Sequence, residues 1–136
     1  MYNKKIMDVF ANPYNAGSLR GANGVGKVGN AQCGDIMKIY LKINDDGIIE
    51  DAKFKTFGCA AAIASTNTAI DLIKGKTIEE ALLVKNSDVI EVLGGLPPAK
   101  VHCSILAEEA IHAAVEDYYK RKEKADKKDS SEDDED

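Results

Sequence analysis

The sequence predicts an α+β fold, a small three-stranded antiparallel sheet with helices packed on one face and a long C-terminal helix. Two neighbouring segments, residues 36–43 and 48–57, alternate apolar and polar side chains with the period of two that is typical of half-buried strands. The turn Asn-Asp-Asp-Gly at 44–47 separates them, which indicates an antiparallel hairpin. Most helical patterns follow these strands, and strands followed by helices favour an α+β layer arrangement.

The remaining elements follow from shorter patterns. Residues 3–11 fit a helix, and a third strand at about residues 25–31 would be the natural neighbour of the hairpin, inside a glycine-rich loop. Thr77 and Glu80 have the spacing of a capping box, which starts a short helix. We expect four helices after the sheet, at residues 60–74, 77–83, 87–93 and 104–122.

Length and composition indicate one core. The chain has 136 residues, of which 44% are hydrophobic, and this suits a single domain. From residue 120 onward Ala125 is the one apolar residue. This segment therefore cannot bury enough apolar surface to offset the conformational entropy lost on ordering. We therefore expect a folded domain at residues 1–122 and a charged, disordered tail at residues 123–136.

The charge is unevenly distributed along the chain. The net charge is -5, but residues 129–136 carry six acidic residues and no basic one, which leaves 18 basic and 17 acidic residues in residues 1–128. A nearly neutral body lacks the basic footprint of a nucleic-acid-binding protein. No segment has the ~18 consecutive apolar residues of a membrane span, and the N-terminus leads into no signal-peptide core. We expect a cytoplasmic protein that binds neither nucleic acid nor membrane.

Two phosphate-binding patterns in the glycine-rich segment are interpreted as coincidences. Residues 24–29 read Gly-Val-Gly-Lys-Val-Gly, but they lack the flanking strand and helix that place a pyrophosphate at a helix N-terminus. Residues 21–27 begin like a P-loop, but Val28 stands where Ser or Thr would bind magnesium. Neither pattern predicts a nucleotide site.

Three cysteines form the candidate site. Cys33 precedes a predicted strand, Cys59 follows one, and Cys103 precedes the last predicted helix, so none lies on the apolar phase of an element. At such junctions backbone N–H groups and helix N-termini lower a thiol pKa and favour the thiolate that binds metal. Three thiolates leave one position of a tetrahedral zinc or iron site open, for which Asp35 and His102 are the nearby candidates. Inert, buried thiols are the alternative interpretation.

Four motifs stand in order along the chain. They are Asn12-Pro13-Tyr14-Asn15-Ala16-Gly17, then Cys33-Gly34-Asp35, then Phe54-Lys55-Thr56-Phe57-Gly58-Cys59 with Ala62-Ile63-Ala64-Ser65, and finally Leu96-Pro97-Pro98-Ala99-Lys100-Val101-His102-Cys103-Ser104. In this order they resemble the IscU/NifU-type scaffold proteins of iron–sulfur cluster assembly. The resemblance covers nearly everything from residue 2 to about residue 119.

The resemblance implies a function for these residues. It implies a scaffold, not an enzyme, on which a transient [2Fe–2S] cluster is built from iron and from sulfur that a cysteine desulfurase supplies, then passed to apo iron–sulfur proteins. Cys33, Cys59 and Cys103 would be its ligands, with Asp35 or His102 in the fourth position, and zinc can occupy the same site. Cys103, at the start of the longest helix and beside His102, is predicted to be the first sulfur acceptor.

One motif departs from the family pattern, and another feature separates the branches of the family. Leu96-Pro97-Pro98-Ala99-Lys100 resembles a recognition segment for an Hsp70-type chaperone, but it has alanine where valine is usual. The related SUF-branch zinc proteins carry an insertion before the last cysteine and lack the histidine beside it. His102 therefore favours the IscU branch, and a zinc-dependent persulfide sulfur acceptor is the alternative function.

Overall fold

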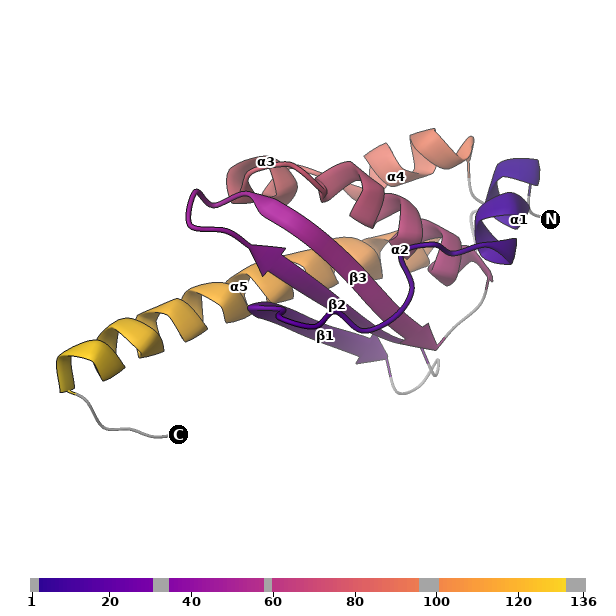
Figure 1. The fold of residues 1–136 in the computed structure, drawn as a ribbon. Coiled ribbons are helices and arrows are strands. Elements are labelled where there is room, and N and C mark those ends of the chain that lie inside the picture. Colours follow the sequence, from indigo (N-terminus) through magenta and orange to yellow (C-terminus); the bar gives the residue numbers. More distant parts are fainter. Residues whose placement is uncertain (1–2, 31–34, 58–59, 96–100, 132–136) are drawn as a thin grey trace.

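The computed structural model describes residues 3–30, 35–57, 60–95 and 101–131, and it has the predicted α+β architecture. A three-stranded antiparallel sheet in the order β1-β2-β3 lies against a layer of helices (Figure 1). The elements are α1 (Lys4–Ala11), β1 (Gly24–Asn30), β2 (Asp35–Ile43), β3 (Ile49–Phe57), α2 (Ala60–Ile73), α3 (Ile78–Leu82), α4 (Asn86–Leu93) and α5 (Val101–Ser131). The three strands and the first four helices lie close to their predicted positions.

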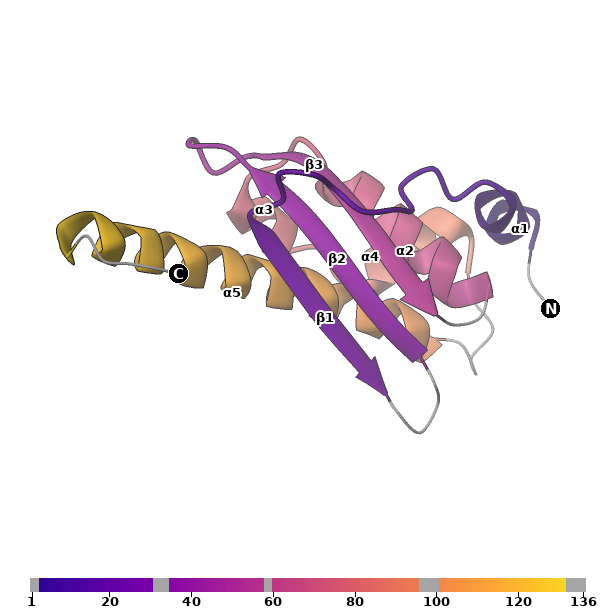
Figure 2. The ribbon, with the colours of Figure 1, turned by 60° about the horizontal axis from the view of Figure 1, so that its bottom comes forward.

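The alternation in the strands separates a buried face from an open face. The side chains buried against the helices come from alternate positions of β2 and β3, namely Met37, Ile39, Leu41, Ile43, Ala52 and Phe54. Figure 2 shows the open face, with the strands in front of the helices. The hairpin between β2 and β3 is held by Asn44, whose Oδ1 accepts hydrogen bonds from the backbone N–H groups of Asp46 (2.9 Å) and Ile48 (3.0 Å). The predicted hairpin is confirmed.

Local signals in the sequence also place α2 and α3. Residues 61–70 of α2 are almost all buried, because small side chains allow this helix to pack on several sides at once. Gly75 follows α2 with φ +80°, a left-handed conformation that suits glycine. At the start of α3, the Glu80 backbone N–H donates to the Thr77 hydroxyl (3.2 Å), and the Thr77 backbone N–H donates to the Glu80 carboxylate (3.0 Å). The predicted capping box is confirmed.

The glycines of β1 allow a close contact with α5. A Cβ atom added to Gly24 would lie 2.7 Å from the carbonyl oxygen of Ala114, and one added to Gly26 would lie 2.5 Å from the carbonyl oxygen of Ala110. Both glycines pair with inward-facing residues of β2, so they face the helix layer. Small residues on both elements bring the two backbones together. The glycine pattern that resembles a nucleotide fingerprint is therefore a packing surface in a strand.

Helix α5 differs from its prediction at both ends. It begins at Val101 instead of Ser104, so the backbones of His102 and Cys103 belong to its first turn and do not lie before the helix. Proline restricts its own backbone and that of the residue before it, so Pro98 in the sequence does not prevent a helix from starting at Val101. The helix also continues to Ser131 instead of ending near Lys122, because its last part contains no glycine or proline and is rich in good helix formers.

The end of the chain is described as far as α5 extends. In Figure 1, the C-terminal end of α5 projects beyond the sheet. The division between a folded domain at 1–122 and a tail at 123–136 stays a prediction. Within the described ranges, no helix combines the length and the apolar character needed to cross a bilayer.

The first prediction concerns the contact between β1 and α5. Gly26→Ala would place a methyl group against the α5 backbone, which cannot move like the end of a side chain, so we expect a loss of about 1–3 kcal/mol of unfolding free energy. Urea unfolding measures this loss. Lys27→Ala, on the outward-facing neighbour in β1, is the control and should change stability by less than about 0.5 kcal/mol. Equal effects of the two substitutions would contradict the packing role of Gly26.

Candidate site at the cysteine end of the sheet

The structure describes part of the predicted ligand set. Asp35 is the first residue of β2, and His102 and Cys103 lie in the first turn of α5. Cys33 and Cys59 lie outside the described residues, as does the predicted chaperone segment at 96–100.

Three strand ends meet at one end of the sheet. Asn30, at the end of β1, pairs with Asp35 at the start of β2. Ile36 in turn pairs with Phe57, at the end of β3. The segments that contain Cys33 and Cys59 therefore both join the sheet at the same end.

The first turn of α5 reaches the same end of the sheet. Gly24 packs against Ala114 and Tyr118, whereas Gly26 packs against Ala110 and Ala114, so α5 runs opposite to β1. From Gly26 to the end of β1 the strand rises about 13 Å, which corresponds to about nine residues of helix. The α5 residues that lie level with the end of β1 are therefore about nine positions before residues 110–114. They are about residues 101–105, where the helix begins. In Figure 2, the start of α5 lies beside this end of the sheet.

Two helix N-termini also belong to this end. Helix α2 begins at Ala60, one residue after Cys59, and Cys103 is the third residue of α5. The first N–H groups of a helix have no partner within it, and they favour a nearby negative charge. Thiolates of Cys59 and Cys103 would gain from this arrangement, which is the condition for binding a soft metal.

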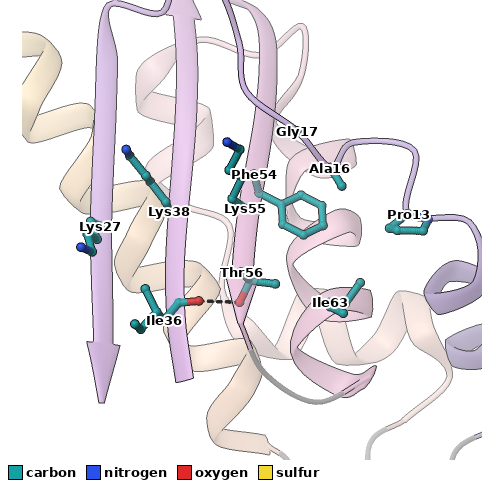
Figure 3. A pocket seen from close by; sticks show the side chains of 10 residues that line it. All are labelled: Pro13, Ala16, Gly17, Lys27, Ile36, Lys38, Phe54, Lys55, Thr56 and Ile63. Atoms are coloured by element: carbon teal, nitrogen blue, oxygen red, sulfur yellow. Dashed lines mark hydrogen bonds between the residues drawn. The ribbon is translucent and has the colours of Figure 1, made fainter. Parts of the chain in front are cut away.

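A pocket of about 450 Å³ opens close to this end of the sheet (Figure 3). Its walls come from the segment before β1, from all three strands and from α2, and they are mainly apolar with lysines among them. The lining residues are Pro13, Ala16, Gly17, Lys27, Ile36, Lys38, Phe54, Lys55, Thr56 and Ile63. Two of them lie near the predicted ligands in the sequence, since Ile36 follows Asp35 and Thr56 precedes Cys59 by three residues.

Three lysines form a row across the open face of the sheet. Lys27 pairs with Lys38, and Lys38 pairs with Lys55, so their side chains share one face. Like charges in directly opposed positions destabilise a sheet, and no ion pair joins these lysines to a carboxylate in the described part of the chain. Reasoning from net charge missed this row, because the charge is balanced over the body. The strand register reveals the row, because alignment of the three strands places the three lysines opposite one another.

Asn15 holds the wall of the pocket in place. Its backbone N–H donates to Asn67 Oδ1 (2.8 Å), and its side-chain amide donates to the carbonyl oxygen of Asn67 (2.9 Å) and to Asp71 (3.0 Å). Its side-chain oxygen accepts from Lys74 Nζ (2.8 Å), and its carbonyl oxygen accepts from the Phe54 N–H (3.0 Å). Asn15 is 1% exposed, so these bonds satisfy a buried polar side chain. They join the segment before β1 to α2 and β3.

Titratable groups also occur in the described residues outside the predicted ligand set. His112 is exposed on α5, beyond the first turn of that helix. Among the described residues, no group of three or more His, Cys, Asp or Glu side chains is arranged to hold a metal ion.

The fold and this clustering of element ends define a class, a small α+β domain with its cysteine segments at one end of the sheet. The model of the NifU-like N terminal domain matches residues 1–125 of the chain. The chain therefore belongs to the NifU N-terminal family, and the resemblance seen in its motifs is confirmed.

Individual relatives agree with this assignment. The chain is 54% identical over 127 residues to iron-sulfur cluster assembly scaffold protein IscU 1 of Archaeoglobus fulgidus, covering 93% of this chain and 82% of that protein. It is 50% identical over 125 residues to the Escherichia coli K12 scaffold protein IscU, covering 90% and 97% of the two chains. A putative SUF-system scaffold from Fervidobacterium islandicum superimposes with a TM-score of 0.68 at 29% identity, covering 83% and 95%.

The second prediction concerns Tyr14, next to Asn15. Its hydroxyl donates a hydrogen bond to Asp71, and this bond, partial burial and the charge of Asp71 raise the pKa of Tyr14. The folded state thus favours the neutral phenol, so its stabilising effect is complete below pH of about 10 and is lost as the pH rises through the raised pKa. Tyr14→Phe should lower stability at neutral pH and lose less stability than the wild type between pH of about 9 and 11.

Urea unfolding across this pH range tests the prediction. Tyr119→Phe removes a hydroxyl from another exposed tyrosine and serves as the control. If the Tyr14→Phe and wild-type curves run parallel through the alkaline range, the bond to Asp71 does not couple Tyr14 ionisation to folding.

Proposed function

We propose that this protein is a scaffold on which a [2Fe–2S] cluster is assembled and from which it is transferred to apo iron–sulfur proteins. Family membership supports the scaffold role, since the relatives named above are cluster assembly scaffolds. The observation that supports the assignment to particular residues is the meeting of three strand ends and two helix starts, which are the element ends next to Cys33, Cys59 and Cys103 in the sequence. Iron and sulfur are substrates of this assembly, and the scaffold itself catalyses no turnover.

The cluster would be held by the three cysteine thiolates and one further ligand. Thiolates are soft ligands that suit iron–sulfur clusters and zinc. The fourth ligand would be Asp35 or His102, because each is close in sequence to one of the cysteines. A carboxylate is a harder and more exchangeable ligand for iron than a thiolate, which suits a cluster that must leave.

Sulfur would arrive from a cysteine desulfurase as a persulfide. A Cys103 thiolate attacks the terminal sulfur of that persulfide, the sulfur–sulfur bond of the donor breaks, and the donor cysteine leaves as a thiolate. Cys103 then carries the persulfide. Reduction of this sulfur to sulfide needs two electrons from a separate electron donor. We place these steps in the cytoplasm, where thiols are kept reduced.

Recipients and a chaperone complete the proposed partners. The cluster would pass to apo iron–sulfur proteins, and Leu96-Pro97-Pro98-Ala99-Lys100 would be the contact segment for an Hsp70-type chaperone. We propose no nucleic-acid or membrane partner.

The third prediction tests the scaffold function. Anaerobic reconstitution of the full chain with ferrous iron, cysteine, a desulfurase and dithiothreitol as the electron donor should give visible absorption from a cluster with two iron atoms per protein, because that is the composition of [2Fe–2S]. Cys33→Ser, Cys59→Ser and Cys103→Ser should each lose most of this absorption. His112→Ala, which changes an exposed residue later in α5, should keep it.

Metal counting distinguishes the proposed function from its alternative. A wild-type protein that accumulates bound sulfur and zinc but no iron cluster would favour the zinc-dependent persulfide acceptor. Cluster formation that survives in all three serine variants would contradict the proposed ligand set.

The fourth prediction identifies the sulfur acceptor. With a persulfidated desulfurase and no iron, mass spectrometry should find the added sulfur on Cys33→Ser and Cys59→Ser but much less on Cys103→Ser. The physical reason is that Cys103 lies in the first turn of α5, beside His102, where a thiolate is favoured. Equal labelling of the three variants would show that Cys103 is not the preferred acceptor.

A further inference from the structure

The two edges of the sheet differ in what covers them. At the β3 edge, the segment before β1 lies along Phe54. The Gly17 N–H donates to the Phe54 carbonyl oxygen (2.7 Å), and the Phe54 N–H donates to the Asn15 carbonyl oxygen (3.0 Å). Strand β1 forms the other edge, and among the described elements no strand lies along its outer side (Figure 2).

The register shows which backbone groups of β1 point outward. Successive residues of a strand direct their N–H and C=O groups to opposite edges. Because Phe54 directs these groups away from β2, its partner Ile39 directs its own towards β1, where it pairs with Gly26. Gly26 therefore bonds towards β2. Lys27 and Gly29, in the opposite phase of the strand, point to the outer edge.

The start of β1 agrees with this direction. The Val25 N–H, two residues before Lys27, donates to Asp117 Oδ2 on α5 (2.9 Å), so it also points away from β2. Helix α5 thus satisfies the first outward donor. Within the described ranges, no hydrogen bond reaches the outward N–H and C=O groups of Lys27 and Gly29, and both residues are exposed. The open part of the edge is residues 27–29.

The lysine row indicates the charge of a strand that would fit this edge. A residue opposite Lys27 on an added strand would share the open face with Lys27, Lys38 and Lys55. No ion pair joins these lysines to a carboxylate in the described part of the chain. Opposite charges in directly opposed positions stabilise a pair of strands, and like charges destabilise it. An acidic residue is therefore favoured opposite Lys27.

We propose that the outer edge of β1 at residues 27–29 binds an extended segment of a partner protein by strand addition, with an acidic residue of that segment opposite Lys27. Main-chain hydrogen bonds to Lys27 and Gly29 would supply affinity, and the charge of Lys27 would supply specificity. A second copy of the chain fits less well, because the register centred on Lys27 opposes two lysines. No metal ligand takes part, so this inference does not rest on the proposed function.

Synthetic peptides test the proposal on the full chain. The probe is a capped peptide of alternating valine and threonine with one central glutamate, and a second probe has lysine in that position. NMR hydrogen exchange should show that the glutamate probe protects the amides of Lys27 and Gly29. The amide of Val28, which faces β2, is the internal reference. We expect the lysine probe to bind about fivefold more weakly, because one attractive cross-strand pair becomes repulsive.

A charge reversal in the protein should reverse this preference. Lys27→Glu changes an exposed side chain on the open face, and this variant should bind the lysine probe more tightly than the glutamate probe. Lys55→Glu is the matched control, because it makes the same change in the same row but on β3, two strands away from the open edge. It should keep the preference for glutamate.

Methylation of the probe backbone separates strand addition from simple charge attraction. N-methylation of the central glutamate removes the amide that would point at β1, so binding should be lost. N-methylation of the next residue removes an amide that points away from β1, so binding should persist.

Three results with the probes would overturn the proposal. They are Lys27 and Gly29 amides that stay unprotected at every soluble concentration of the glutamate probe, equal binding of the two methylated probes, and an unchanged preference in Lys27→Glu. Sedimentation of the protein without any probe tests the other occupant. A dimer in which the Lys27 and Gly29 amides are already protected would show that a second copy covers the edge, and it would overturn the proposal as well.

Discussion

The contact between the β1 glycines and α5 sets the geometry of the whole domain. Gly24 and Gly26 have no side chain to hold the helix away, and Ala110 and Ala114 meet them with small side chains. Helix and sheet therefore touch through their backbones. Because the contact repeats every two residues of strand and every four of helix, it sets the position of α5 along β1 as well as its distance from it.

The position of α5 along β1 matters for the proposed site because the first turn of α5 contains the predicted ligands His102 and Cys103. If the helix slid by one turn along β1, its start would move by about 5.4 Å relative to the sheet end that carries the Cys33 and Cys59 segments. A metal site does not tolerate such a shift.

The segment before β1 is attached to the domain by a different kind of interaction. Its attachment relies on the hydrogen bonds of Asn15 and Tyr14 to α2, with backbone bonds to β3. Hydrogen bonds depend on geometry more strongly than apolar contacts do, so this wall of the pocket has one well-defined position. Beside it, the three lysines of the row lie on the open face of the sheet, and no ion pair joins them to a carboxylate among the described residues.

Much of this protein could be predicted from local sequence. The Asn44 turn, the Thr77–Glu80 capping box and the alternation in β2 and β3 all act between residues close in the chain, and so the elements they define were placed nearly correctly. The family motifs, too, are contiguous stretches of sequence. The cysteines were singled out because each stands at a junction between elements, a property that local patterns also reveal.

Tertiary structure decided what depends on residues distant in the chain. The glycines of β1 could not be interpreted as a packing surface until α5 lay against them, since that contact joins segments about 90 residues apart. The lysine row and the Asn15 bonds likewise depend on strand register and helix placement. The sequence by itself determined the elements and the chemistry they carry, whereas packing decided which of them meet, because register and close contact are properties of pairs of segments.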